Sequence, residues 1–160
     1  MIIFVEGPDG SGKSTLIEQL KERYITARVS KAAESKFVWD KLKVLGRQLG
    51  EDTVLMMDRS PLTEYVYRSE DNSEAKFTYS FVLGWLRGGK LIYCKSNTSH
   101  EDAMNRGEDN VTSKTKHDRI EQLYDTFIST LSKEGVRIMY YNWRENSPED
   151  VINFIEGKEN

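Results

Sequence analysis

Short apolar runs alternate along the chain with segments in which apolar residues recur every three or four positions. The runs are rich in β-branched and aromatic residues, which is typical of strands buried on both faces of a sheet. They predict strands at residues 2–5, 54–57, 91–94 and 136–141, and a further short strand at about 27–30. The helical spacing predicts helices at about 16–24, 34–49, 61–68, 74–86 and 120–131, and a last one that starts near Ser147.

Because strands alternate with helices, the pattern favours an α/β class with a five-stranded parallel sheet and helices on both faces. The sequence contains no internal repeat and no convincing linker, so we expect one domain over residues 1–160. Residues 96–113 are polar and poorly periodic. This stretch predicts a mobile loop, and we expect a lid at roughly 98–116.

The composition indicates which partners and which cellular compartment to expect. The chain is 38% hydrophobic and 31% charged, with a net charge of −3, so it exerts no overall attraction on nucleic acid. The single cysteine, Cys94, lies in an apolar run and predicts a buried thiol in a reducing compartment. The apolar runs are too short for a membrane span, and the N-terminus lacks a signal-peptide pattern. We expect a cytoplasmic protein, or one of the host cytoplasm if the chain is viral.

Residues 7–14 match the pattern G-x-x-x-x-G-K-[ST] between the first predicted strand and its helix. Glycines let successive backbone N–H groups point at one anion, and the helix N-terminus adds its dipole. Lys13 can follow the γ-phosphate, and the Ser14 hydroxyl can bind Mg²⁺. The segment predicts a three-layer P-loop NTPase fold that takes ATP and Mg²⁺ as cofactors. The expected nucleotide-binding residues are Gly7, Gly10, Ser11, Gly12, Lys13, Ser14 and Thr15.

A polar pair follows the strand predicted at residues 54–57. Asp58 stands where a Walker B aspartate would hold Mg²⁺, and Arg59 follows it directly. The carboxyl ends of parallel strands face the ligand crevice of an open α/β sheet. Arg59 could therefore bind an acceptor phosphate or stabilise the transferring phosphoryl.

A family resemblance rests on these two segments. Residues 4–15 resemble the start of the thymidylate kinases, which carry an E-G-x-D-G-x-G-K-[ST]-T segment. The triplet Asp58-Arg59-Ser60 is similar to elements of the thymidylate kinases and of the deoxynucleoside kinases, and residues 63–67 continue like the latter and like small viral members. The resemblance implies that Asp9 contacts the acceptor's sugar. It also implies that Asp58 and Arg59 contact the acceptor and the transferring phosphoryl.

The sequence departs from that pattern after the second strand. Thymidylate kinases carry an R-E-P-G-G segment there, whose arginine holds the acceptor phosphate. Residues 31–35 of this chain read Lys-Ala-Ala-Glu-Ser instead. Deoxynucleoside kinases place a glutamate base nearby, so Glu34 is a candidate for that base and for contact with the acceptor. The departure counts against dTMP as the specific acceptor.

Basic residues gather in and after the polar loop. Arg106, before a glycine, matches the place of the lid arginine in the kinases, which compensates charge in the transition state. Lys114, Lys116, His117 and Arg119 could steer a polyphosphate or could simply be solvated.

The sequence thus predicts an enzyme that transfers a phosphoryl group from ATP to a deoxynucleoside monophosphate or a deoxynucleoside. The expected catalytic residues are Lys13, Asp58, Arg59 and Arg106. Two alternatives stay open: a kinase for a hydroxyl on DNA or a modified base, and a regulatory ATPase without a small-molecule acceptor. A small nucleoside or nucleotide is the expected partner; DNA is not favoured, a membrane is not expected, and a homodimer stays open.

Overall fold

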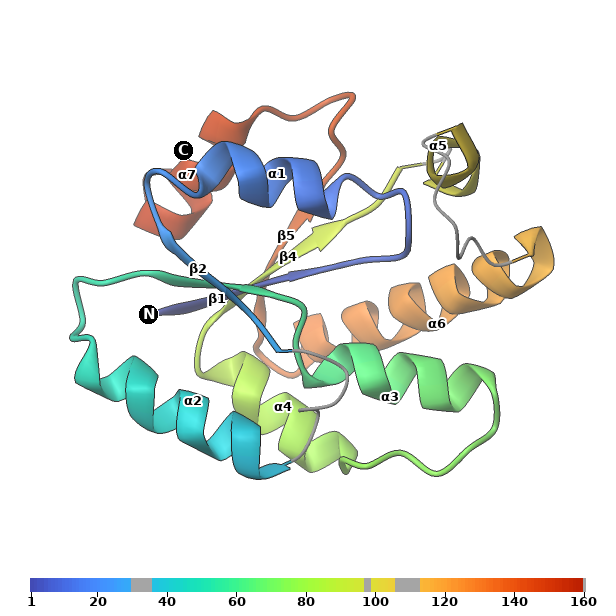
Figure 1. Cartoon of the computed structure of the whole chain (residues 1–160), viewed down its shortest axis with the longest axis horizontal. Helices are drawn as coiled ribbons and strands as arrows, with labels where there is room; N and C mark the ends of the chain where they lie inside the picture. The colour runs from blue at the N-terminus through green and yellow to red at the C-terminus, as the bar shows by residue number, and fades with distance from the viewer. Residues whose placement is uncertain (30–35, 97–98, 106–112, 160) are drawn as a thin grey trace.

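A computed structural model describes residues 1–29, 36–96, 99–105 and 113–159. Strands and helices alternate along the described chain, and five strands form one sheet (Figure 1). The strands are β1 (Ile2–Glu6), β2 (Ile25–Arg28), β3 (Leu55–Asp58), β4 (Lys90–Cys94) and β5 (Arg137–Tyr141). The helices are α1 (Lys13–Leu20), α2 (Lys36–Gln48), α3 (Pro61–Glu70), α4 (Tyr79–Arg87), α5 (Ser99–Asn105), α6 (Lys114–Lys133) and α7 (Pro148–Glu156).

The sheet has the order β2-β3-β1-β4-β5, and every neighbouring pair is parallel. The predicted α/β class with a five-stranded parallel sheet is therefore confirmed. β1 lies in the centre, with β3 on one side and β4 on the other. The chain reverses its direction of winding at β1, and such a switch point is where open α/β sheets bind ligands.

Helices cover both faces of the sheet (Figure 1). Helices α1 and α7 pack on one face, and α2, α3, α4 and α6 pack on the other. The alternation of side chains along β1 serves both layers, because Ile3 and Val5 join the α1 and α7 side while Phe4 joins the opposite side. By the same alternation, Glu6 points toward the layer that holds α3 and α6.

Two elements differ from the sequence-based prediction. The helix expected at 74–86 begins only at Tyr79, because Thr78 caps it by accepting a hydrogen bond from the backbone N–H of Phe81. The backbone N–H of Lys76 instead bonds the Glu64 side chain at 3.0 Å, which holds this stretch outside the helix. Helix α5 also lies within the stretch predicted as a mobile loop, although residues 106–112 of that stretch are outside the described chain.

None of the helices in the described ranges combines the length and hydropathy that crossing a bilayer requires. Cys94 is fully buried at the end of β4, as predicted, and burial raises the pKa of its thiol to about 12.

Candidate active site

The glycine-rich loop leaves β1 at its carboxyl end and enters α1 directly. Gly7, Gly10 and Gly12 have φ angles of 145°, 75° and 90°, which side chains rarely adopt. Gly10 also has no room for one, because a Cβ atom there would lie 1.8 Å from the carbonyl oxygen of Ser99 at the start of α5. Gly12 stands at the N-cap of α1, and a glycine has no side chain to occupy the first amides of the helix. The loop is therefore shaped as a backbone cradle for an anion.

Lys13 lies along the inside of this loop. Its Nζ donates to the carbonyl oxygens of Gly7 and Pro8, the latter at 2.7 Å, and lies 3.3 Å from Ser11 Oγ. Burial lowers the pKa of Lys13, and the charge of Arg59 lowers it further. A buried ammonium with a depressed pKa gains most from an anionic ligand that offsets both effects.

The two hydroxyl residues after Lys13 face different spaces. Ser14 lines the cleft in front of the loop, together with Asp58 and Arg59. Thr15 lines a second hollow on the other side of Gly12. The predicted P-loop residues thus lie together, and of the two hydroxyls Ser14 is the one in the cleft that also contains Asp58.

Asp58 and Arg59 reach the cleft from the end of β3. The Arg59 backbone N–H donates to the carbonyl of Val5 at 3.0 Å, and its φ angle is 80°, in the left-handed region. This turn directs the guanidinium toward the loop, where Arg59 Nη2 lies 3.9 Å from Asp9 Oδ1. Burial acts to lower the pKa of Arg59, but the neighbouring Tyr124 and Glu6 hold that pKa above its ordinary value. Asp9 and Arg59, which were each predicted to contact the acceptor, are thus adjacent.

Glu6 organises the turn that carries Arg59, and sequence reasoning gave it no role. It is fully buried, and its Oε1 accepts hydrogen bonds from the Ser60 N–H at 2.9 Å, the Ser60 hydroxyl at 2.6 Å and the Thr63 hydroxyl at 2.7 Å. Its Oε2 accepts one from the Tyr124 hydroxyl at 3.0 Å. The sequence did contain an indication of this role, because a glutamate at the end of a buried apolar strand needs hydrogen-bond donors inside the protein.

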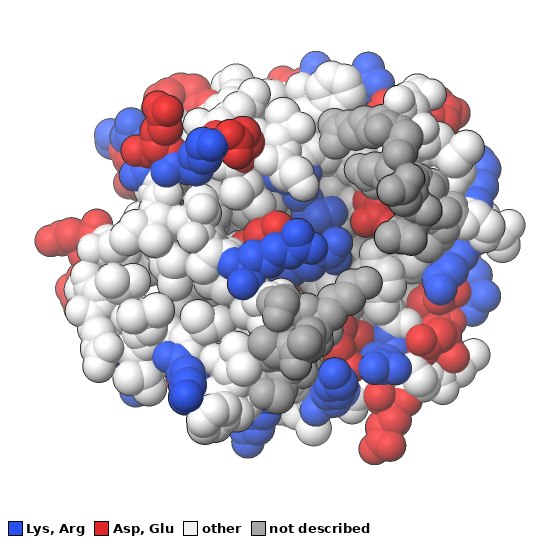
Figure 2. All heavy atoms as spheres, viewed as in Figure 1, with Lys and Arg blue, Asp and Glu red and all other residues white. Residues whose placement is uncertain are grey.

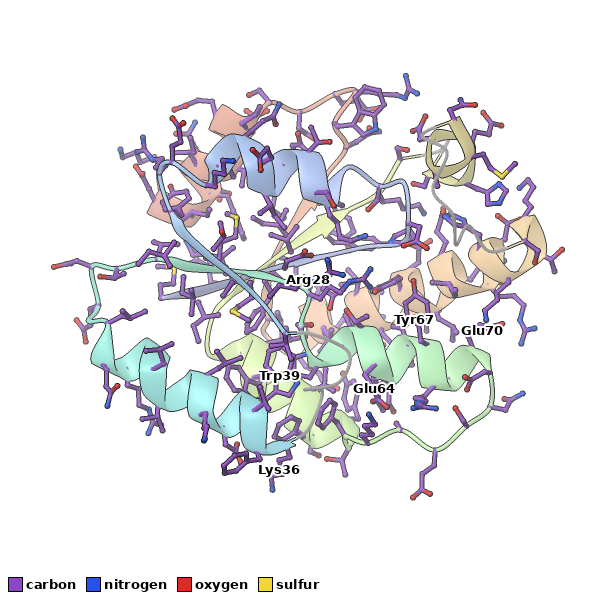
Figure 3. The ribbon with its side chains drawn as sticks, viewed as in Figure 1. Arg28, Lys36, Trp39, Glu64, Tyr67 and Glu70 are labelled. Atoms are coloured by element: carbon purple, nitrogen blue, oxygen red, sulfur yellow. The ribbon has the colours of Figure 1, made fainter. Side chains whose placement is uncertain are left out.

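Arg28 is a second residue that the sequence analysis missed. It ends β2 and is the register partner of Asp58 on β3, so both side chains leave the sheet on the same side. Its Nε lies 3.8 Å from Asp58 Oδ2, and the side chain is 62% exposed. Arg28 lines the cleft with the P-loop and lies in the middle of the face shown in Figure 3. Basic side chains gather at this point of the surface in Figure 2.

Tyr67 approaches the same cluster from α3 (Figure 3). Burial raises the pKa of its hydroxyl to about 12, and the charge of Asp9 contributes to the shift. The hydroxyl therefore stays protonated at neutral pH, beside Asp9 and Arg59. Asp9, Asp58 and Arg59, which the sequence analysis predicted, thus lie together with Arg28 and Tyr67, which it did not assign to the site.

The second hollow lies on the opposite side of the loop, next to β5. Its volume is about 240 Å³, and its lining includes Gly12, Thr15, Tyr141, Trp143 and Asn146. The Trp143 ring lies close to Gly12, since a Cβ atom on Gly12 would come within 3.1 Å of it. A flat aromatic wall beside a phosphate cradle can stack on a planar ring system.

Two predicted site residues, Glu34 and Arg106, lie outside the described residues. Their roles stay predictions. The basic residues in the first turns of α6 are largely paired in the described chain. Lys116 and Arg119 each lie 3.6 Å from a carboxyl oxygen of Glu70 at the end of α3. His117 is buried rather than solvated.

With this geometry established, comparison with known proteins defines the class of fold. No protein-family model matches the chain, and no curated protein matches its sequence. Among solved structures, the chain shares its fold with the YorR protein and with a deoxyadenosine kinase.

The similarity extends over nearly the whole of this chain and of each neighbour. The YorR protein of Bacillus subtilis, in complex with phosphorylated GDP, superimposes with a TM-score of 0.73 at 21% identity, over 99% of this chain and 97% of YorR. The deoxyadenosine kinase of M. mycoides, with the products dCMP and a flexible dCDP bound, gives a TM-score of 0.57 at 15% identity, over 99% and 98%. At these identities the likeness establishes the fold, and the activity has to be argued from the site.

Proposed function

We propose that this chain is a kinase that transfers the γ-phosphoryl group of ATP to a deoxynucleoside monophosphate. The observation that carries the proposal is the position of Arg28. Its guanidinium stands at the carboxyl end of β2, in the same cleft as Lys13 and Arg59, on the side of the P-loop away from the Trp143 hollow. A cation in that place suits a second phosphate-bearing substrate.

The donor would lie across the loop. Its phosphates would occupy the backbone cradle of residues 7–14, and its base would enter the hollow beside Trp143. Because β5 and β2 lie at opposite edges of the sheet, a donor that enters from the β5 side meets an acceptor from the β2 side at the P-loop. This arrangement brings the two substrates end to end, as in-line transfer requires.

The residues present fit a magnesium ion as well. Ser14 and Asp58 line one cleft with the cradle, and a hydroxyl and a carboxylate are ligands that Mg²⁺ accepts, directly or through water. When bound, Mg²⁺ would neutralise negative charge on the donor phosphates. Ser14 and Asp58 are the residues that would hold it.

The acceptor end of the cleft has groups for both parts of a nucleotide. Asp9 accepts hydrogen bonds and fits a sugar hydroxyl, while Arg28 and Arg59 fit a phosphate. The arginine segment that thymidylate kinases carry after the second strand is absent from residues 31–35, but Arg28 places a guanidinium at the end of that strand itself. The M. mycoides neighbour is a deoxyadenosine kinase with dCMP and dCDP bound as products, which supports a deoxynucleoside-type acceptor in general. The choice of the monophosphate rests on Arg28 in the cleft.

Catalysis would then depend on positively charged side chains that stabilise the transferring phosphoryl group. Lys13 would follow the transferring phosphoryl from the donor side, and Arg59 would stabilise it from the acceptor side. A monophosphate oxygen is already anionic and needs no strong base, whereas a nucleoside hydroxyl would need one. Asp58 is engaged with Arg28 at 3.8 Å, which suits the monophosphate better than the base role.

A substrate panel with three Arg28 and Arg47 variants tests the proposal. MgATP is offered with deoxynucleosides, deoxynucleoside monophosphates and oligonucleotides, and the products are identified by mass. We expect the monophosphates to react, and Arg28→Met to raise their KM about 10- to 100-fold, the range for a lost charge-assisted bond. Arg28→Lys should restore part of the affinity. Arg47→Met removes an exposed cation from α2 and should change nothing.

Three results would overturn the proposal. Phosphorylation of deoxynucleosides alone would indicate the deoxynucleoside activity instead. Transfer to oligonucleotides with a steep salt dependence would indicate a DNA kinase. ATP hydrolysis that ignores every acceptor would indicate a regulatory ATPase.

A further inference from the structure

His117 lies at the start of α6, far from the P-loop in sequence and in contact with it in space. The helix begins after Ser113, whose carbonyl accepts the His117 backbone N–H at 2.9 Å, and this places the imidazole inside the molecule. The residue is only 2% exposed. Its Nε2 lies 3.0 Å from the backbone carbonyl oxygen of Asp9. Because a carbonyl only accepts, His117 must donate through Nε2.

The other sides of the ring are enclosed too. The His100 ring of α5 packs edge-on against it, with the ring centroids 5.2 Å apart. Nδ1 is buried and has no hydrogen-bond partner among the residues that the structure describes. Glu121 Oε2 lies 3.9 Å from Nδ1, and Glu121 itself pairs with Lys95 at 3.4 Å. The one close hydrogen bond of the ring is therefore the bond to Asp9.

That bond acts on a residue at the junction of the two substrate sites. Asp9 directs its carboxylate toward Arg59, at 3.9 Å, and its carbonyl toward His117. Its neighbours are constrained in other ways, since the Pro8 carbonyl accepts from Lys13 and Gly10 is packed against Ser99. Among these contacts, the one from His117 is made to the Asp9 carbonyl itself.

We propose that His117 is a positioning residue for the acceptor, acting through its Nε2–H bond to the carbonyl of Asp9. This inference rests on the proposed function, because it assigns Asp9 to the acceptor. The bond holds the Asp9 peptide in the orientation that keeps the carboxylate beside Arg59. Loss of the bond lets the peptide rotate, and the acceptor loses a fixed hydrogen-bond partner. The cradle amides of Lys13 and Ser14 belong to the first turn of α1 and are held by the helix, so the donor keeps most of its site.

The test measures acceptor binding and donor binding separately in variants of His117. His117→Phe keeps a ring in the cavity and removes the donor, and His117→Gln keeps an N–H group at a similar reach. We expect His117→Phe to raise the KM for the monophosphate about tenfold, the effect of one lost hydrogen bond, with the Kd of a non-hydrolysable ATP analogue within about twofold of the wild type. His117→Gln should recover most of the loss. Asp118→Asn, which removes an exposed ion pair to Lys114 from the same helix turn, serves as the matched control.

A purely structural histidine would give a different result. Parallel changes in acceptor KM and ATP-analogue Kd, no change in either, or no advantage of Gln over Phe would each overturn the inference. A readout without turnover keeps it separate from the proposed function. The ¹⁵N spectrum of the wild type at pH 8 should show His117 protonated at Nε2 and bare at Nδ1, and the opposite tautomer would overturn the inference even in an active enzyme. If the monophosphates do not react but the tautomer is as expected, the proposed function fails and, with it, the acceptor role of His117.

Discussion

The carboxyl group of Glu6 lies 3.0 Å from the hydroxyl of Tyr124, a residue 118 positions further along the chain. The contact joins the end of the central strand to the middle of α6. The second oxygen of Glu6 accepts three hydrogen bonds from Ser60 and Thr63, at the start of α3. One buried acid thus connects β1, α3 and α6 directly behind the turn that carries Arg59.

We expect Glu6→Gln to lower the free energy of unfolding by about 2–3 kcal/mol, because every bond to the acid loses its charge and one amide N–H₂ must face donors. Tyr124→Phe should cost about 1 kcal/mol, since it removes a single bond. Urea titration measures both, and kcat should fall in Glu6→Gln as the Arg59 turn loosens. Tyr140→Phe, at an exposed tyrosine, is the control. Equal stability of Glu6→Gln and the control would contradict this account.

The backbone of Arg59 gives a second prediction. Its φ angle of 80° is unfavourable for any residue with a Cβ atom. Arg59→Gly and Arg59→Ala both remove the guanidinium and should both abolish phosphoryl transfer. The glycine variant should nevertheless be more stable than the alanine variant by about 1 kcal/mol, because only glycine adopts this conformation freely. Thermal denaturation compares the two, and a more stable alanine variant would show that the turn relaxes.

Much of the fold could be predicted because the information is local. Apolar runs and glycine-rich breaks define strands and the phosphate loop within a few residues of sequence. The carboxyl end of β2 was harder, since its residues are mostly exposed and carry little apolar signal. The predicted strand at 27–30 lies two residues too late against the observed Ile25–Arg28. That shift placed Arg28 inside a strand rather than at its end, and so concealed it as a site residue.

The remaining omissions depend on contacts between distant segments. Nothing near His117 in sequence indicates that Asp9 will meet it, and its basic neighbours suggest a solvated surface. The hydrophobic periodicity did not indicate helix α5, because its sequence is polar. Its place is fixed instead by the close approach of Ser99 and Ala103 to Gly10. Such pairings follow from the assembled sheet, and periodicity along the chain cannot reveal them.

Gly10 tests this packing directly. A Cβ atom there would lie 1.8 Å from Ser99 O and 2.7 Å from Ala103 N, both backbone atoms that cannot move alone. Gly10→Ala should therefore displace α5 from the loop, lower the Tm and reduce kcat/KM more than tenfold, since a misplaced loop of about 1 Å costs about that much or more. Gly84→Ala is the matched control, because nothing lies within 4 Å of its Cβ position in α4. It should raise stability by about 0.5–1 kcal/mol through helix propensity.

The last turn of α7 gives a prediction for acid stability. Glu156 binds Lys158 at 2.7 Å and also accepts bonds from Arg23 and Tyr24, which follow α1. Hydrogen bonds from Lys158 and then from Arg23 lower the pKa of Glu156 to about 2. A carboxyl group whose pKa is lower in the folded than in the unfolded state stabilises the fold above its unfolded pKa of about 4.5, and this contribution is lost as the pH falls toward 2. Glu156→Gln should therefore be less stable than the wild type at pH 7, and the difference should shrink between pH 4.5 and 2.

Urea midpoints across that pH range measure the effect, with Glu22→Gln, an exposed glutamate close to the end of α1, as the control. Because Glu156 lies at the surface, 1 M salt should reduce the difference at pH 7 as well. A difference that persists unchanged at pH 2 would mean that the Glu156 side chain stabilises the α1–α7 contact through packing rather than through its charge. The position of α7 against α1 would then depend on the apolar layer that Leu16, Leu20 and Ile155 share beneath it.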